Sequence, residues 1–158
     1  MRHLGMVSKS EGGITALNSK RLHQKVRVTF RFVGDNVDPQ EITSLMRMQP
    51  SAAHAKGDRV AKHPDRVYPT GFWGLESSIP PDRSLEEHLK RMLSVLEPQA
   101  SAIRSLERSG LPARFFCGFF IAETDSGAYI EIGPDTLEGI AELRSRLELH
   151  IYYVNEED

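Results

Sequence analysis

Residues 26–32 read Val-Arg-Val-Thr-Phe-Arg-Phe, and the rest of the fold can be argued outward from this alternation. A two-residue period is typical of a strand with one buried face and one face in water. The apolar members therefore point into a core, and Arg27, Thr29 and Arg31 point away from it. Such a strand needs a second layer to cover its apolar face, so amphipathic helices are expected elsewhere in the chain.

Two segments carry helix-start signals. Residues 38–41, Asp-Pro-Gln-Glu, combine an N-cap, a proline at the first helical position and a glutamate three residues on, and Pro50 ends this first helix. Residues 84–87, Ser-Leu-Glu-Glu, form a second capping box before an apolar stripe. Pro98 predicts a kink or a restart in that helix, and Gly110 predicts its C-terminal end.

The remaining elements follow from the same patterns. A strand is expected over 72–77, and 51–70 is a long polar loop that is either functional or partly disordered. Residues 114–122 are apolar on both faces, which suits a central strand covered on each side, and a hairpin is expected to return through 128–132. A helix through 137–144 and an alternating strand over 147–153 complete the chain.

The resulting order is strand, helix, loop, strand, one or two helices, two strands, helix and strand. It predicts an α+β fold: a two-layer sandwich with helices on one face of a mostly antiparallel sheet. A ferredoxin-like topology is the leading prediction. The alternative is an α+β sandwich with another strand order.

Length and composition favour one globular domain. A chain of 158 residues with 39% hydrophobic and 27% charged residues excludes a disordered chain, a coiled coil and a membrane span. We expect a flexible N-terminal arm over 1–24, a single domain over 25–155 and an acidic tail over 156–158. The net charge of −2 supplies no general attraction for nucleic acid or anionic lipid.

The same data favour a cytoplasmic protein with no membrane partner. No apolar signal region follows the start, and no stretch approaches the roughly 18 apolar residues that cross a bilayer. The single cysteine, Cys117, forms no internal disulfide, so a reducing compartment is the default.

The motifs of common reactions are missing from the sequence. His54, Asp58 and His63 are spaced too widely for a rigid metal site, and Cys117 lies in the most apolar strand, where a thiol is buried and inert. There is no phosphate-binding glycine loop and no nucleophile elbow. We therefore predict no catalytic residue, metal or cofactor, and favour a role other than catalysis.

The uncovered face of the sheet is the main candidate for function. If the strands are neighbours, it carries Arg27 and Arg31 from the first strand, Tyr129 from the hairpin, and His150 and Tyr152 from the last strand. Arginine and tyrosine are enriched at the residues that dominate binding energy in protein interfaces. The hypothesis is an interaction surface for a protein partner or a second copy of the chain, and the simpler alternative is an ordinary solvated face.

The sequence also suggests two other functions. His54, Lys56, Arg59 and Trp73 would form a small-molecule or anion-binding site, or a weak active site, if Trp73 walls a pocket beside the polar loop. RNA binding by the sheet face is the second alternative, because residues 114–119 have a faint basic-aromatic order. The glycine positions do not fit that pattern and the net charge is negative, so nucleic acid is not the expected partner.

A set of short motifs in a fixed order resembles a known bacterial family, domain of unknown function 4279. The motifs are Gly34-Asp35 with Asp38-Pro39 and Ile42-Thr43, Leu45-x-x-Met48-x-Pro50-Ser51-x-Ala53, Lys56-Gly57-Asp58, Trp73-x-Leu75-x-Ser77 and Leu85-x-x-His88-Leu89-x-x-x-Leu93-x-x-Leu96-x-Pro98. The resemblance covers about residues 26–154 and implies a small bacterial cytoplasmic α+β protein. It brings no activity, cofactor or catalytic residue. Stand-alone members of such families sometimes act as immunity or antitoxin-like partners of secreted toxins, which is the specific form of the interaction hypothesis.

Overall fold

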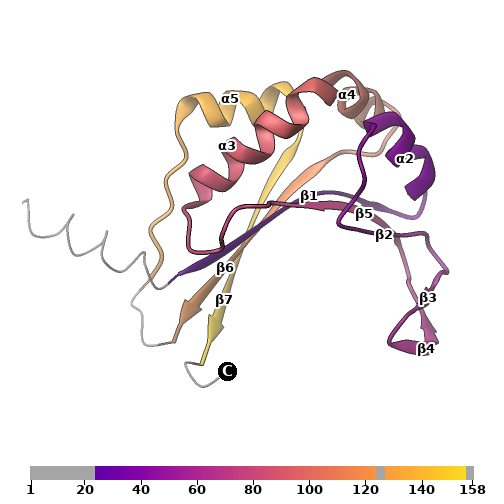
Figure 1. The fold of residues 1–158 in the computed structure, drawn as a ribbon, viewed down its shortest axis with the longest axis horizontal. Helices are drawn as coiled ribbons and strands as arrows, with labels where there is room; N and C mark the ends of the chain where they lie inside the picture. Colours follow the sequence, from indigo (N-terminus) through magenta and orange to yellow (C-terminus); the bar gives the residue numbers. More distant parts are fainter. Residues whose placement is uncertain (1–23, 124–126, 156–158) are drawn as a thin grey trace, which may run out of the picture.

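The computed structural model describes residues 24–123 and 127–155, and these form two layers (Figure 1). One layer is a five-stranded sheet in the order β2-β5-β1-β6-β7. The strands are β1 (Lys25–Gly34), β2 (Ala52–His54), β5 (Gly71–Glu76), β6 (Arg114–Ala122) and β7 (Arg146–Val154). The other layer contains α2 (Pro39–Met46), α3 (Leu85–Leu96), α4 (Ala100–Arg108) and α5 (Pro134–Glu142). The prediction of an α+β fold with a mostly antiparallel sheet is confirmed.

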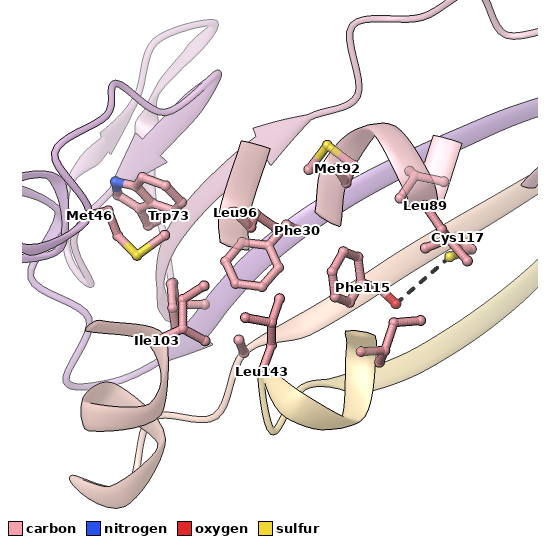
Figure 2. Close-up of a cluster of buried hydrophobic side chains, with 14 of the residues drawn as sticks. Phe30, Met46, Trp73, Leu89, Met92, Leu96, Ile103, Phe115, Cys117 and Leu143 are labelled. Carbon is pink, nitrogen blue, oxygen red and sulfur yellow. Dashed lines mark hydrogen bonds between the residues drawn. The ribbon is translucent and has the colours of Figure 1, made fainter. Parts of the chain in front are cut away.

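β1 lies at the centre of the sheet, and its alternate residues are buried as the sequence pattern predicts. It pairs antiparallel with β5 on one side and with β6 on the other. Val28, Phe30 and Phe32 are fully buried, whereas Arg27 on the opposite face is exposed. The Phe30 ring packs edge-on against Phe32 and Phe115 at centroid distances of 5.4 and 5.2 Å. Figure 2 shows Phe30 and Phe115 of this cluster among the other buried side chains of the core.

The helix ends follow the capping residues. The Asp38 carboxylate accepts hydrogen bonds from the backbone N–H groups of Gln40 and Glu41, and Ser84 forms both halves of a capping box with Glu87. At Pro98 the chain passes through one turn of 3₁₀ helix, η2 (Glu97–Gln99), and restarts as α4. Within the two described ranges, no helix has the length and apolar content to cross a membrane.

The hairpin predicted for residues 114–132 is wrong. Residues 128–132 are not a strand, and β6 pairs instead with β1 on one edge and with β7 on the other. β7 runs parallel to β6, with α5 as the crossover that a parallel pair requires. Because both edges of β6 are occupied, an alternating segment after it has no edge left to join. The ferredoxin-like topology is accordingly not confirmed.

Residues 51–70 contain regular structure. β2 joins the edge of the main sheet, and β3 (Arg59–Val60) pairs with β4 (His63–Val67) as a separate two-stranded sheet. Backbone bonds from Gly57 N to Tyr68 O (2.8 Å) and from Tyr68 N to Asp58 O (2.9 Å) close its base. The predicted arm and tail lie outside the described residues, except for Gln24, which is buried and donates through Nε2 to Gly127 O at 3.3 Å.

His88 is the buried titratable group of the helical layer. It is 2% exposed in α3, and its Nδ1 lies 2.8 Å from Ser77 Oγ. Burial lowers its pKa, and the Pro80 backbone and the charges of Glu87 and Asp82 oppose that effect only in part. The folded state therefore binds a proton at His88 less readily than the unfolded chain does.

This predicts a loss of stability in mild acid. The contribution of neutral His88 to the free energy of unfolding is fully present above the ordinary histidine pKa of 6.5. It is lost as the pH falls below that value and through the lower pKa of the folded state. Each unit by which the pKa of His88 is depressed costs about 1.4 kcal/mol at low pH. Urea unfolding at about pH 7.5 and about pH 5 should show a smaller pH dependence for His88→Gln than for the wild type. Equal pH dependence in both would contradict the assignment.

Candidate functional site: the open face of the sheet

The four helices cover one side of the sheet, and among the described residues no helix covers the other side, where the small β3–β4 sheet projects near β2 (Figure 1). We call the side chains on this uncovered side the open face. The strand register and burial pattern assign to it alternate residues of each strand: Lys25, Arg27, Thr29, Arg31 and Val33 of β1; Ala52 and His54 of β2; Phe72, Gly74 and Glu76 of β5; Arg114, Phe116, Gly118, Phe120 and Ala122 of β6; Arg146, Glu148, His150, Tyr152 and Val154 of β7.

Glu148 joins three strands of the open face. Its Oε2 accepts from Arg31 Nη2 at 2.9 Å and its Oε1 accepts from Arg114 Nη1 at 2.8 Å. The three side chains are only 24–32% exposed, so these pairs are less screened than ordinary surface ion pairs. Partial burial alone would raise the pKa of Glu148, but the hydrogen bonds and charges of Arg114 and Arg31 outweigh it and hold the pKa below its ordinary value.

Aromatic rings continue this network along β6 and β7. The Arg31 guanidinium carbon lies 4.2 Å from the centroid of the Phe116 ring, and the His150 ring lies 4.6 Å from Phe116. Further along, Phe120 and Tyr152 stack at 5.1 Å with their planes 15° apart. At that separation the two nearly parallel rings lie against each other in a stacked arrangement. The facing sides of Phe120 and Tyr152 are therefore occupied within the protein.

The open face is positively charged although the whole chain carries −2. Its two carboxylates, Glu76 and Glu148, stand against five cations: Lys25, Arg27, Arg31, Arg114 and Arg146. The remainder of the chain is correspondingly acidic. This separation of charge favours an anionic surface on any partner of the open face.

The structure places four of the five predicted surface residues, Arg27, Arg31, His150 and Tyr152, on the open face. Tyr129 is not among them. It lies in the irregular segment after β6, where its hydroxyl donates to Glu131 Oε2 at 2.7 Å and where it lines a cavity together with Phe119 of the core face. Its predicted position depended on the hairpin that does not form.

Sequence reasoning missed Phe116, Phe120 and Glu148 as members of this face. Residues 114–122 were predicted to be covered on each side, but helices cover only the side of Cys117, and Phe116 and Phe120 are half-buried on the other. The sequence did contain the information needed. Phe116 and Phe120 are at even-numbered positions of the strand and Cys117 is at an odd-numbered position, so they point to opposite faces of the sheet.

The second predicted site is not assembled. Trp73 is fully buried on the helix side of β5, and its Nε1 donates to Thr43 Oγ1 at 3.0 Å. His54 stacks on Tyr68 and on Phe72, which is on the opposite side of the sheet from Trp73. Lys56 pairs with Asp35, and Arg59 lies in the separate β3–β4 sheet. Successive residues of a strand point to opposite faces, so Trp73 cannot wall a pocket that His54 enters.

The potential metal ligands and the thiol of the described residues can be checked directly against the structure. No three histidine, cysteine or acidic side chains within 24–123 and 127–155 are placed to hold a metal ion. Burial raises the pKa of the Cys117 thiol to about 12, with a smaller contribution from Glu148. A thiol with this pKa is not a nucleophile near neutral pH.

A half-open cavity of about 360 Å³ lies beside the start of α3, and Glu86 is its most buried carboxylate. Glu86 is used structurally, because Thr136 Oγ1 and Gly133 N donate to it at 2.7 and 3.2 Å and so tie α3 to the start of α5. Burial would raise the pKa of Glu86, but these bonds and Lys90 lower it overall. It therefore stays ionised and is unsuited to act as a general acid.

The comparisons agree with the motif-based resemblance. The family model described as "Domain of unknown function (DUF4279)" matches residues 24–154. Comparison with the curated proteins and with the solved structures gives no match.

Proposed function

Because the chain belongs to the DUF4279 family, whose description names no activity, we propose its function from its surface: a non-enzymatic module that binds a protein partner through the open face. The partner's docking surface is acidic with apolar side chains at its centre. The observation that carries the proposal is the uncovered sheet surface on which Arg31, Phe116, His150, Phe120 and Tyr152 contact one another.

Preorganisation supports this proposal. Arg31 is held by Glu148 and by the Phe116 ring, so it loses little side-chain freedom when a partner docks. His150 and Tyr152 keep 46% and 41% of their surface in water, which leaves area for a partner to bury. Rigid aromatic and arginine side chains of this kind dominate the binding energy of protein interfaces.

The ring geometry favours a protein over single-stranded RNA. A base binds by stacking on the free face of an aromatic ring. Phe116 has Arg31 and His150 against its ring, and Phe120 and Tyr152 cover each other. The edges of these rings and their exposed parts still provide apolar contact area for protein side chains, which do not need to stack on a ring face.

The test is capture with matched variants. Tyr152→Ala and Arg27→Glu should each weaken the binding of a captured protein partner by about 10-fold or more, since loss of an interface hot spot costs about 2 kcal/mol. Both side chains are exposed, and Arg27 makes only a 3.5 Å pair with Glu76, so neither change should unfold the chain. Binding is measured by calorimetry with the partner identified by mass spectrometry.

Arg91→Glu is the control, because Arg91 is an exposed cation of α3, in the helical layer on the other side of the sheet. It should bind as the wild type does. Equal capture by all variants would refute the proposal. Capture that nuclease abolishes and that weakens steeply with salt would assign the open face to nucleic acid instead. The immunity-type role stays a prediction, which a toxin among the captured partners would support.

A further inference from the structure

Among residues 24–123 and 127–155, β7 is the last strand of the sheet, so one of its edges has no neighbouring strand within this part of the chain. Arg146 N donates to Ala113 O at 3.0 Å and Val154 O accepts from Glu123 N at 3.1 Å, so the even-numbered residues of β7 bond toward β6. Successive residues of a strand direct their backbone groups to opposite edges. The N–H and C=O groups of residues 147, 149, 151 and 153 therefore point to the free edge, where they form a template for an added strand.

The side chains along this edge are apolar and exposed. Leu149, Ile151 and Tyr153 point to the helix side of the sheet but extend beyond α5, and they are 47%, 49% and 63% exposed. In Figure 1, β6 and β7 project past the helical layer. Of the nine large apolar side chains that are exposed among the described residues, five lie on β7. Such a concentration marks an interaction site rather than scattered surface residues.

β7 also lacks the features that protect an edge strand. Its register with β6 runs without a bulge from Arg146 to Val154, and the segment contains no proline and no lysine. Natural proteins use bulges, prolines and edge lysines to prevent strand pairing. An edge nine residues long with none of these is suited to pair with another strand.

The charges at the two ends of β7 select the partner and its direction. Arg144 and Arg146 stand at the start of the strand, and Glu123 lies at its far end, where its backbone N donates to Val154 O at 3.1 Å. A second β7 in antiparallel orientation brings each basic start opposite the other's acidic end. A second β7 in parallel orientation would instead place like charges together.

We propose that two copies of this chain pair through β7, antiparallel and edge to edge, about a twofold axis perpendicular to the sheet. The pairing is isologous, so each copy contributes the same residues. Leu149, Ile151 and Tyr153 of both copies form an apolar strip across the joint on the helix side. The two sheets become continuous, and both open faces lie on the same side of the dimer and remain uncovered.

Sedimentation equilibrium on the full chain, from about 1 μM to about 1 mM, tests the proposal. The expected mass is twice 17.8 kDa, falling to 17.8 kDa for Ile151→Lys, because a lysine breaks the apolar strip while its half-exposed position keeps the fold intact. Val67→Lys is the matched control: Val67 is 57% exposed in β4, away from this edge, and the dimer should persist.

Hydrogen exchange locates the contact. The amides of Leu149, Ile151 and Tyr153 should be protected in the dimer and exchange faster in Ile151→Lys. A monomer at every concentration overturns the proposal, and so does a dimer that Ile151→Lys leaves intact. A monomer with these amides protected would assign the edge to another part of the same chain and would also overturn it.

The proposal is separable from partner binding by the open face. Arg27→Glu should leave the dimer mass unchanged, and Ile151→Lys should still bind the partner. If either the dimer proposal or the partner-binding proposal fails, the experiments on the other can still be interpreted.

Discussion

Replacing Trp73 with alanine should lower the free energy of unfolding by about 3–5 kcal/mol, the range for removing a large buried aromatic side chain. The indole is fully buried, lies 6.0 Å from the Phe32 ring between centroids and belongs to the continuous core under the helices (Figure 2). A domain of this size has about 5–15 kcal/mol of stability in total, so the variant should be close to unfolding. Urea unfolding followed by far-UV circular dichroism measures the loss, because the substitution removes the single tryptophan.

Thr43→Val separates packing from hydrogen bonding at the same place. It keeps the shape of the side chain and removes the acceptor for the indole N–H, so a cost of about 1 kcal/mol is expected. A loss under about 1 kcal/mol for Trp73→Ala would contradict the core position. That result would reopen the binding-site interpretation, in which Trp73 contacts a ligand and contributes little to stability.

Replacing Glu148 with glutamine should cost about 1–3 kcal/mol, the largest effect expected on the open face. The change leaves Arg31 and Arg114 without their shared counter-charge, although their side chains are only 24% and 32% exposed. Glu76→Gln is the matched control. It removes the same chemical group from the same face, but its pair with Arg27 is exposed and 3.5 Å long, so about 0.5 kcal/mol or less is expected.

The Glu148 effect should depend on pH in a defined direction. The pKa of Glu148 is lower in the folded than in the unfolded state, so its contribution is fully present above the ordinary value of 4.5 and is lost as the pH falls through the folded-state pKa. The difference in unfolding free energy between wild type and Glu148→Gln should therefore shrink below about pH 4.5. A difference that stays constant down to pH 3 or so would contradict the ion-pair interpretation.

The two substitutions also test the division of the sheet into faces. Trp73 belongs to the buried face and Glu148 to the open face, and each is placed by the strand on which it lies. If both predictions hold, a variant of the open face can be interpreted as a change at a surface. The capture and association experiments depend on this distinction.

Much of the fold was predictable because its determinants are local. The alternation in 26–32, the caps at Asp38 and Ser84 and the break at Pro98 each involve residues a few positions apart, and each is confirmed. The face of Arg27 and Arg31 followed from the same alternation. These features need no knowledge of which strands are neighbours.

The local pairing of β3 with β4 within residues 51–70 was not predicted, and the other errors arose where distant segments meet. Residues 128–132 alternate as a strand does, yet they form none, because β1 and β7 occupy both edges of β6. Tyr129 was misplaced for that reason. Trp73 was placed beside the polar loop by its position in the sequence, but β5 turns it into the core and turns its neighbour Phe72 toward His54.

Periodicity and capping residues alone were enough to establish the helices, most of the strands and the inward or outward side of each residue on β1. Strand order, the parallel pairing of β7, the shared contact of Arg31 and Arg114 with Glu148, and the exposed edge of β7 came only from the assembled sheet. The physical reason is the distance along the chain over which each interaction acts. Backbone conformation responds to neighbours within one helical turn or one strand, whereas pairing is a competition among all strands for a limited number of edges.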